Sequence, residues 1–230
     1  KVRGKIPGQK SLKYAELLKR FECPQITYLS DSFPVFLKKA SGANVFDVDG
    51  NRYLDLTSGF GVANLGYNSK TVLEAIKKQS KLMIHGMGDV HPNDVKAELA
   101  KRLSEVTPGN LNQTIFSSTG SEAVESALKT AVMYTKKPGV IAFTGAYHGL
   151  GYGALQATHR EHFRKPFLKQ FGNFVYFAPF PDENLYGSDA TQISIKTITT
   201  IIQRAKRSAQ AIGAVIVEPI QGRGGIIVPP

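Results

Sequence analysis

The stretch that decides the fold runs from Thr114 to Gly149 and reads TIFSSTGSEAVESALKTAVMYTKKPGVIAFTGAYHG. Two short apolar runs, 114–116 and 140–143, predict strands, and the apolar spacing between them predicts a helix over 121–135. A strand, a helix and a second strand in this order are typical of a parallel sheet that helices cover on both faces. We therefore expect an α/β protein with a mostly parallel sheet, whose ligand lies beyond the carboxyl ends of the strands.

The pattern changes on either side of this stretch. Downstream, apolar spacing predicts a helix over 189–209 and a strand over 214–217, whereas the aromatic and proline-rich segment 145–187 predicts irregular structure across the open edge of the sheet. Upstream, helices are predicted to begin at Ser69 and at Asn93 or Asp94. The runs 35–39, 43–48 and 52–56 predict a β-meander with a tight turn at Asp49-Gly50.

These patterns predict two parts of unequal size. Residues 1–60, a helix plus the β-meander, form a β-rich N-terminal segment that we assign to a smaller domain. Residues 61–230 form the first half of a larger cofactor-binding domain. The sequence opens on Lys1 and stops at Pro230 directly after an apolar run, so we expect both ends to be cut from a longer chain.

Composition narrows the class of protein. Of the 230 residues, 42% are hydrophobic and 20% are charged, which excludes wholesale disorder. The one cysteine, Cys23, excludes a disulfide framework and a cysteine-based metal cluster, and it favours a reducing compartment. The first residues are basic and polar, with no secretory signal, and the longest uncharged stretch, 138–158, contains five glycines and is no membrane span. We expect a cytoplasmic protein with no bound metal and no membrane partner.

The net charge of +11, from 29 basic and 18 acidic residues, raises the question of an anionic partner. Seven of the basic residues lie within the first 20 positions, and most of the others are spread singly on helices near acidic residues. This distribution favours a solvated basic surface with a positive N-terminal arm, and it leaves a nucleic-acid-binding module as the minor alternative.

The first strand end leads from Ser117 into a helix. Thr119 and Glu122 have the spacing of a capping box, in which Thr119 accepts from the third helical N–H and Glu122 reaches back. Gly120 allows a close approach of the backbone, and free N–H groups at a helix start favour an anion. The turn is therefore a candidate phosphate site, although a plain helix cap uses the same residues. It lacks the glycine pattern of an NTPase P-loop or a dinucleotide fingerprint.

The other two strand ends carry an aromatic residue and an acid. Tyr147, flanked by small residues, can stack on a planar ring, and His148 could bond a ligand or the backbone of its own loop. Glu218 follows four apolar residues, where a carboxylate is costly to desolvate unless it binds something, although a solvated loop position remains open. The glycine-rich loop 222–225 suggests backbone that wraps a ligand or moves. Together the three ends describe a site for a phosphorylated aromatic cofactor.

Three collinear motifs carry a family resemblance: FSSTGSEAVE at 116–125, YHG at 147–149 and VEPIQG at 217–222. With DVDGNRYLD at 47–55 and GFGV at 59–62, they resemble the class III pyridoxal-phosphate-dependent aminotransferases. The resemblance implies the PLP-dependent transferase fold type I, pyridoxal 5'-phosphate (PLP) as cofactor, and a homodimer with its active sites at the subunit interface. It also implies transfer of an amino group between an ω-amino acid or amine and a keto acid, as in 4-aminobutyrate- or ornithine-type enzymes.

The resemblance also implies roles for single residues. Gly120 and Ser121 would hold the cofactor phosphate, and Thr119 would cap the same helix. On the ring side, Tyr147 would stack on the pyridine and His148 would support it. Glu218 would lie near the O3′ side of the ring, and Phe60 would line the substrate pocket.

The catalytic residues of the family are expected outside this sequence. The lysine that forms the Schiff base and the acid that pairs with the pyridine nitrogen follow the Glu-Pro-Ile-Gln-Gly motif downstream in family members, so we assign no catalytic residue within residues 1–230. Because that lysine anchors the cofactor and moves protons, we expect this segment alone to be unable to transaminate.

One position departs from the family pattern. Arg223 stands where members that use glutamate as amino donor often carry a glutamate, and it either binds a substrate carboxylate or faces solvent. Two further functions stay open: a PLP-dependent aminomutase or epimerase of the same family, and a catalytically inactive assembly subunit.

Overall fold

The computed structural model describes residues 1–24, 26–206 and 208–230. The chain divides into two compact units, Lys1–Ala97 and Glu98–Pro230, and the division falls within helix α3 (Asp94–Val106). The boundary predicted at residue 60 concerns the domains of the complete protein, and it stays a prediction. Each unit is described by itself below.

Unit 1 contains the predicted helix and meander. Its elements before α3 are α1 (Gln9–Phe21), β1 (Leu37–Ser41), β2 (Asn44–Asp47), β3 (Arg52–Leu54) and α2 (Lys70–Ser80). The three strands form an antiparallel sheet in the order β1-β2-β3, in which Val45 pairs with Ala40 on one side and with Tyr53 on the other. The predicted meander is confirmed, with each strand ending within a few residues of its expected position.

The connection between β2 and β3 is longer than the expected tight turn. Phe46 pairs with Arg52, and of the two turn residues only Gly50 has a positive φ, of 88°. The buried carboxylate of Asp47 accepts hydrogen bonds from the backbone and side chain of Asn51, at 2.7 Å each, so these two residues close the loop. Asp49, at its tip, accepts from the backbone N–H groups of Lys10 and Ser11 and thereby caps the first turn of α1.

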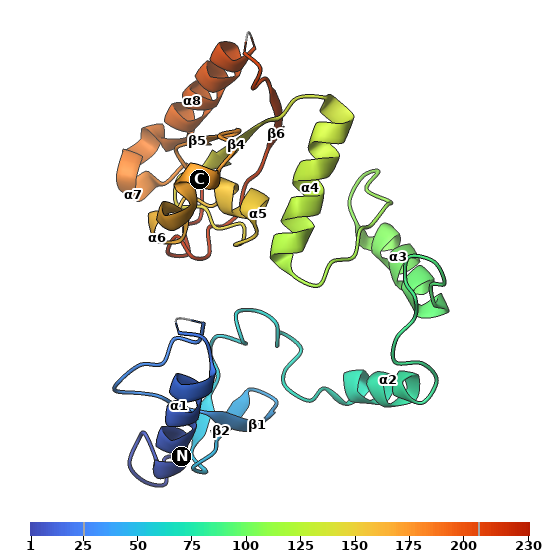
Figure 1. Ribbon diagram of the computed structural model, residues 1–230, viewed down its shortest axis with the longest axis vertical. Coiled ribbons are helices and arrows are strands. Elements are labelled where there is room, and N and C mark those ends of the chain that lie inside the picture. The colour runs from blue at the N-terminus through green and yellow to red at the C-terminus, as the bar shows by residue number, and fades with distance from the viewer. Residues whose placement is uncertain (25, 207) are drawn as a thin grey trace. The chain divides into compact units, whose positions relative to one another are not determined.

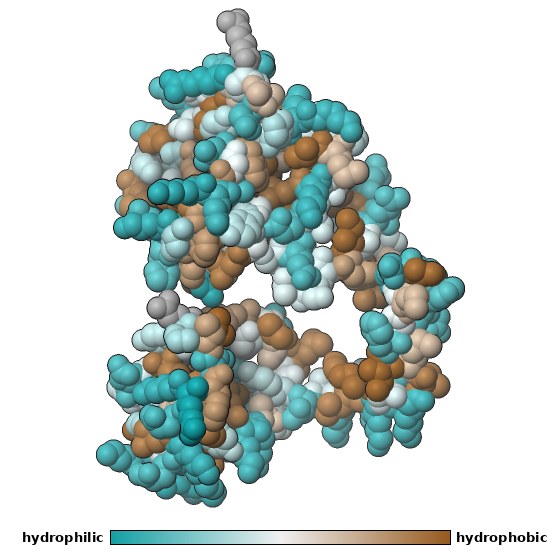
Figure 2. Space-filling view, in the orientation of Figure 1, coloured by the Kyte–Doolittle hydropathy of each residue, from teal (hydrophilic) through white to brown (hydrophobic). Residues whose placement is uncertain are grey.

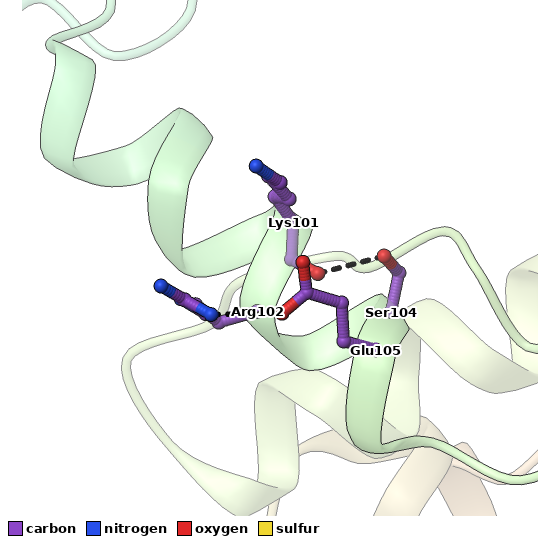
Figure 3. A network of polar contacts seen from close by, with 4 residues as sticks. All are labelled: Lys101, Arg102, Ser104 and Glu105. Carbon is purple, nitrogen blue, oxygen red and sulfur yellow. Dashed lines mark hydrogen bonds and ion pairs between the residues drawn. The ribbon is translucent and has the colours of Figure 1, made fainter.

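Helices α2 and α3 are amphipathic, but neither has a buried residue. On α2, Val72, Leu73 and Ile76 are 42%, 49% and 59% exposed, and Figure 2 shows apolar residues at the surface over this helix. Polar contacts on α3 are local (Figure 3): Arg102 donates to Glu105 at 3.1 Å, and the Ser104 hydroxyl donates to the Lys101 carbonyl. Exposed pairs of this kind add little stability, so packing of apolar faces against other parts of the protein has to stabilise these helices.

Unit 2 is an α/β unit. Its elements after α3 are α4 (Gly120–Thr135), β4 (Gly139–Phe143), α5 (Tyr152–Ala157), α6 (Glu161–Arg164), the 3₁₀ helix η1 (Lys165–Gln170), β5 (Val175–Ala178), α7 (Glu183–Tyr186), the 3₁₀ helix η2 (Gly187–Asp189), α8 (Ala190–Ala205) and β6 (Ile212–Val215). The three strands form a parallel sheet in the order β5-β4-β6. Figure 1 shows α4 and α8 on opposite sides of this sheet, as the sequence pattern predicts.

The central strand β4 is buried along its whole length. Ile141 and Phe143 pack with Ala178 and Phe180 in the main core cluster, which the isoleucines of α8 cover. Val140 points into a groove of about 580 Å³ lined by Leu128 and Val132 of α4. Because successive strand residues face opposite sides, a strand covered by helices on both faces has to be apolar throughout.

Two predictions about local structure are wrong. Residues 114–116 form no strand, because no neighbouring strand among the described residues offers them backbone hydrogen bonds; Ile115 is 65% exposed. The segment 145–187 is not simply irregular, since it contains β5 and several short helices. The strand at 175–178 is short and lies among other aromatic residues, so the hydrophobic pattern does not distinguish it from its surroundings.

No helix within the described ranges is long and apolar enough to span a bilayer. Among these same residues, no group of three or more His, Cys, Asp or Glu side chains is placed to hold a metal ion.

Candidate functional site

Polar residues gather where the parallel strands of unit 2 end. We call this region the rim and define it as residues 117–125 at the start of α4, 144–154 after β4 and 216–223 after β6. All three strands run in the same direction, so their carboxyl ends meet at one edge of the sheet. Seven of the eight predicted site residues lie in the rim, all except Phe60, and hydrogen bonds link its three segments.

The start of α4 has the predicted Thr119 cap, and Glu122 reaches back as expected, but to the residue before the cap. Thr119 accepts from the backbone N–H of Glu122 at 3.1 Å, and Glu122 accepts in turn from the backbone N–H of Ser118 at 2.8 Å. The first N–H groups of a helix lack intrahelical partners, so those of Gly120 and Ser121 remain available. A Cβ at Gly120 would meet nothing within 4 Å, so the space in front of this turn is open.

The loop after β4 lies directly on this helix start. The Ser121 hydroxyl accepts from the backbone N–H of Gly151 at 2.9 Å. Gly149 has a φ of 129°, and a Cβ added there would lie 2.6 Å from Ser121 Oγ and 2.8 Å from Ser121 Cα. Only glycine permits this approach, so the close contact between the loop and the start of α4 depends on Gly149.

Glu125, the last residue of the FSSTGSEAVE motif, has no role predicted from sequence and lies one turn further along α4. One of its carboxylate oxygens accepts from the backbone N–H groups of Gly153 and Ala154, at 2.7 and 2.9 Å. These are the first N–H groups of α5, where a negative charge also interacts favourably with the helix dipole. The signal that could have identified Glu125 is a carboxylate four residues after Ser121 on the same helix, facing a glycine-rich loop.

Tyr147 and Glu218, 71 positions apart in sequence, meet in the rim. The backbone N–H of Tyr147 donates to Glu218 Oε2 at 3.0 Å, and the backbone N–H of Gly222 approaches Oε1 at 3.3 Å. The Glu218 carboxylate is therefore bound by backbone and joins the aromatic loop to the segment after β6. This contact explains why a carboxylate can follow an apolar strand, because the backbone N–H groups replace the hydrogen bonds that the carboxylate loses with water.

The guanidinium of Arg223 lies over the ring of Tyr147, 4.4 Å from its centroid. Phe163 meets the same ring edge-on at 5.7 Å between centroids. A cation over an aromatic face is a favourable contact. A planar ligand that stacks on Tyr147 while Arg223 keeps this position has to use the opposite face of the ring.

His148 has one buried polar atom without a partner. Its backbone N–H donates to the hydroxyl of buried Thr158 at 2.9 Å, and that hydroxyl donates to the carbonyl of Gly149. Within the described residues, Nε2 of His148 is buried and makes no hydrogen bond. Burial lowers the pKa of this imidazole, while the nearby Glu218 carboxylate opposes the shift. A neutral imidazole with a free nitrogen is available to a ligand.

Gln221 is a second rim residue with no role predicted from sequence. It is 1% exposed, and its side-chain amide donates to the carbonyl of Thr144 at 2.7 Å. Its backbone pairs with that of Ile227 in both directions at 3.0 Å, which closes the loop 222–226. A Cβ on Gly145 or Gly224 would lie within 2.6 Å of the Gln221 amide oxygen, so these glycines make room for it.

Phe60, the predicted substrate-pocket residue, lies in unit 1. It has a φ of 57° and is 96% exposed. The remaining predicted residues, Thr119, Gly120, Ser121, Tyr147, His148, Glu218 and Arg223, lie together in unit 2.

The rim fits a phosphorylated aromatic ligand on structural grounds. The start of α4 offers backbone donors and open space, which suit a phosphate. The ring of Tyr147 offers a face for stacking, and the unpartnered Nε2 of His148 offers a hydrogen-bonding atom beside it. These features lie on segments that Ser121, Glu125 and Glu218 bind to one another.

Comparison with known proteins identifies relatives over most of the chain. The family model for Aminotransferase class-III matches residues 27–230. The putrescine aminotransferase of Pectobacterium atrosepticum is 38% identical over 197 residues, covering 84% of this chain and 39% of that protein. The acetylornithine aminotransferase of Methanopyrus kandleri is 38% identical over 198 residues, covering 86% of this chain and 46% of that protein. The chain thus spans less than half the length of either curated relative.

Solved structures agree on the fold. An (S)-enantioselective omega-transaminase from Thermomicrobium roseum matches with a TM-score of 0.82 and 28% identity, over 94% of this chain and 52% of that one. The taurine:2-oxoglutarate aminotransferase of Bifidobacterium kashiwanohense, solved in complex with PLP and glutamate, matches with a TM-score of 0.84 over 100% of this chain and 51% of that one. At 23% identity, the second likeness bears on the fold alone. The predicted fold type I is confirmed.

Proposed function

The chain belongs to the class III aminotransferase family, and from this premise we propose that the protein containing it is a PLP-dependent aminotransferase. It transfers an amino group between an ω-amino acid or amine and a keto acid. The observation that carries the proposal is the joining of three distant motifs in one rim, through the Tyr147–Glu218 and Gly151–Ser121 hydrogen bonds.

The phosphate end of the site is assigned to the start of α4. The backbone N–H groups of Gly120 and Ser121, together with the Ser121 hydroxyl proton, donate to the phosphate oxygens. Thr119 keeps its oxygen on the N–H of Glu122 and so acts on the helix turn, not on the ligand. Support comes from the open space before Gly120 and from the favourable field of a helix N-terminus.

The ring end is assigned to the loop after β4 and the segment after β6. Tyr147 stacks on the pyridine ring, His148 bonds through its free Nε2, and Glu218 holds the polar groups on the O3′ side. His148 is neutral at physiological pH in this role, because burial lowers its pKa. When bound, PLP supplies the electron sink for reactions at the carbon that bears the amino group.

Arg223 is assigned to the substrate end of the site, and Phe60 of unit 1 keeps its proposed role as a substrate-pocket residue. The two curated relatives are named for putrescine and acetylornithine, so we propose a diamine or an ω-amino acid as amino donor. Arg223 already lies over the ring of Tyr147, which brings a permanent cation beside the aromatic loop. From there it binds a substrate carboxylate.

The complete enzyme is proposed to be a homodimer with active sites at the subunit interface. The Schiff-base lysine and the acidic partner of the pyridine nitrogen are proposed to belong to the complete polypeptide beyond residue 230.

The test uses the complete polypeptide. We expect it to purify with, or to acquire on addition of PLP, a visible absorbance that an amine donor bleaches and a keto acid restores. A complete chain carrying the lysine that shows no such absorbance would contradict the proposal. Stoichiometric consumption of the keto acid separates amino transfer from mutase or epimerase chemistry, which retains the amino group. An inactive assembly subunit would show no turnover with any donor.

The matched variants compare the rim with the basic N-terminal arm. Tyr147→Ala should weaken PLP binding by about tenfold, because stacking of an aromatic pair contributes of order 1 kcal/mol and the ring also buries ligand surface. Removing the basic residues before Arg20 should leave the PLP affinity unchanged. The opposite pattern would count against the site, and a salt-sensitive shift of a nucleic-acid probe would support the minor alternative.

A further inference from the structure

We propose that Glu125 is a positioning residue that, with Ser121, sets the distance between the phosphate end and the ring end of the cofactor site. The proposal rests on the proposed function, because it takes the start of α4 and the ring of Tyr147 as the two ends. Neither the family resemblance nor the relatives' names assign Glu125 a role.

Ser121 and Glu125 lie four residues apart on α4 and therefore share one face of that helix. From this face they accept three backbone N–H groups of one short segment, those of Gly151, Gly153 and Ala154, at 2.7 to 2.9 Å. The segment begins four residues after Tyr147. Glu125 thus binds the continuation of the aromatic loop to the helix whose first turn receives the phosphate.

The fit between the helix and the loop is close. A Cβ on Gly153 would lie 2.5 Å from one Glu125 carboxylate oxygen, and a Cβ on Gly151 would lie 2.9 Å from the other. Together with Gly149 against Ser121, glycines at every second position let the loop backbone lie directly on α4. The carboxylate therefore reaches the N–H groups without an intervening side chain.

The opposite side of the same loop is held by other residues. Thr158 binds the backbone of His148 and Gly149, and Glu218 binds the N–H of Tyr147. These contacts orient the Tyr147 ring relative to the sheet. The contacts of Glu125 and Ser121 then place the whole loop relative to α4. These contacts therefore set the distance between the two ends of the cofactor site.

Glu125 acts through the backbone and not on the ligand, because one of its carboxylate oxygens accepts from both N–H groups at the start of α5. Loss of these charge-assisted bonds leaves the phosphate donors of Gly120 and Ser121 in place but releases the ring end. A ligand that uses only the phosphate end should therefore bind as before, whereas PLP, which uses both ends, should bind less tightly.

The experiment uses the complete polypeptide in its PLP-free form. Dissociation constants are measured for PLP by absorbance titration and for inorganic phosphate by competition, in the wild type and in Glu125→Ala, Glu125→Gln and Glu125→Asp. The matched control is Glu183→Ala, an exposed glutamate in the first turn of α7. Glu125→Ala should weaken PLP binding by about tenfold to a hundredfold, and phosphate binding by less than about twofold.

The replacements separate positioning from general stability. Glu125→Gln retains an oxygen that can accept both N–H groups, so it should recover most of the PLP affinity. Glu125→Asp keeps the charge but not the reach, so it should resemble Glu125→Ala, and it serves in place of that variant if the alanine protein does not fold. Glu183→Ala should match the wild type in both constants.

Two results would overturn the inference. Wild-type PLP affinity in Glu125→Ala or Glu125→Asp would show that the contact positions nothing, and equal losses for PLP and phosphate would show a purely structural role. A wild-type protein that binds no PLP would instead contradict the proposed function itself. The two failures are thus distinguishable by the wild-type titration alone.

Discussion

The carboxylate of Asp47 in the unit 1 meander and the carboxylates of Glu125 and Glu218 in the unit 2 rim accept the same kind of hydrogen bond but join different parts of the chain. In the meander, Asp47 accepts from Asn51 and Tyr53, which are four and six residues away. In the rim, Glu125 accepts from residues 28 and 29 positions away, and Glu218 accepts from a residue 71 positions away. The first kind closes a local loop, whereas the second joins segments that carry separate parts of a site.

The difference shows which carboxylates find hydrogen-bond partners among their sequence neighbours and which find them only in distant segments of the folded chain. The buried Asp47 has its partners supplied by the loop that it closes, so the meander needs no other segment for that bond. Glu125 and Glu218 have partners only because the parallel sheet brings the ends of β4 and β6 and the start of α4 to one edge. Variants in the two regions should therefore fail in different ways.

The largest effect is expected from Gly149→Ala in the rim. The new Cβ would lie 2.6 Å from Ser121 Oγ and 2.8 Å from Ser121 Cα, at a φ of 129° that alanine rarely adopts. Backbone strain and overpacking together should cost about 3 kcal/mol or more and separate the loop from α4. Urea unfolding and PLP titration of the complete polypeptide should both show the loss.

Gly222→Ala is the matched control for Gly149→Ala, because a Cβ there meets nothing within 4 Å and the backbone N–H that approaches Glu218 is retained. Its unfolding free energy should stay within about 0.5 kcal/mol of the wild type. Equal stability of the Gly149→Ala protein and the wild type would show that the rim tolerates a wider spacing than the structure has.

A smaller effect is expected from Asp47→Ala in the meander. The variant leaves the buried side chain of Asn51 and the hydroxyl of Tyr53 without their acceptor. Loss of hydrogen bonds to a charged group should lower the free energy of unfolding by about 2 kcal/mol. Thermal or urea unfolding followed by tyrosine fluorescence, with Asp31→Ala at an exposed position as control, measures it. An Asp47→Ala protein as stable as its control would show that the hydrogen bonds of Asp47 do not stabilise the meander.

The smallest effect is expected at acid pH, from Asp55. Hydrogen bonds from Tyr67 and Thr57 lower the pKa of Asp55 from 3.8 to about 2 in the folded state. A carboxylate with a lowered pKa contributes stability above its unfolded pKa, and that contribution is lost as the pH falls through the folded pKa. The free energy of unfolding should therefore decline between about pH 4 and about pH 2.

Asp55→Asn should flatten that decline, since the amide does not titrate. Urea unfolding at closely spaced pH values, in wild type and variant, measures the two slopes. Parallel slopes would show that Asp55 keeps an ordinary pKa. Asp47 and Asp49 should contribute to the remaining slope, because hydrogen bonds outweigh burial at both and lower their pKa values.

Much of the fold and of the site could be predicted from local pattern. The strand at 140–143 is apolar without interruption because both of its faces are covered, and the Thr119–Glu122 spacing alone specifies the Thr119 cap. The three strand-end motifs were expected to lie together, and the described residues place Ser121, Tyr147 and Glu218 in one rim.

The misses have a common physical reason. Residues 114–116 have strand-like composition but no partner strand among the described residues, and β5 has a partner but a weak pattern. Glu125 and Gln221 are ordinary helix and loop residues by sequence, and their roles depend on which distant N–H or carbonyl comes within reach. Strand formation and buried polar pairing both require a second segment, which no local window contains.

Local sequence specifies the helix starts, the apolar central strand, the glycine positions and the motifs that identify the family, because these depend on residues within a turn or two of each other. The folded chain adds the contacts of Glu125 with the start of α5, of Glu218 with Tyr147 and of Arg223 with the Tyr147 ring. Such contacts span 28 to 76 positions, so they exist only once the parallel strands have brought their ends to one edge.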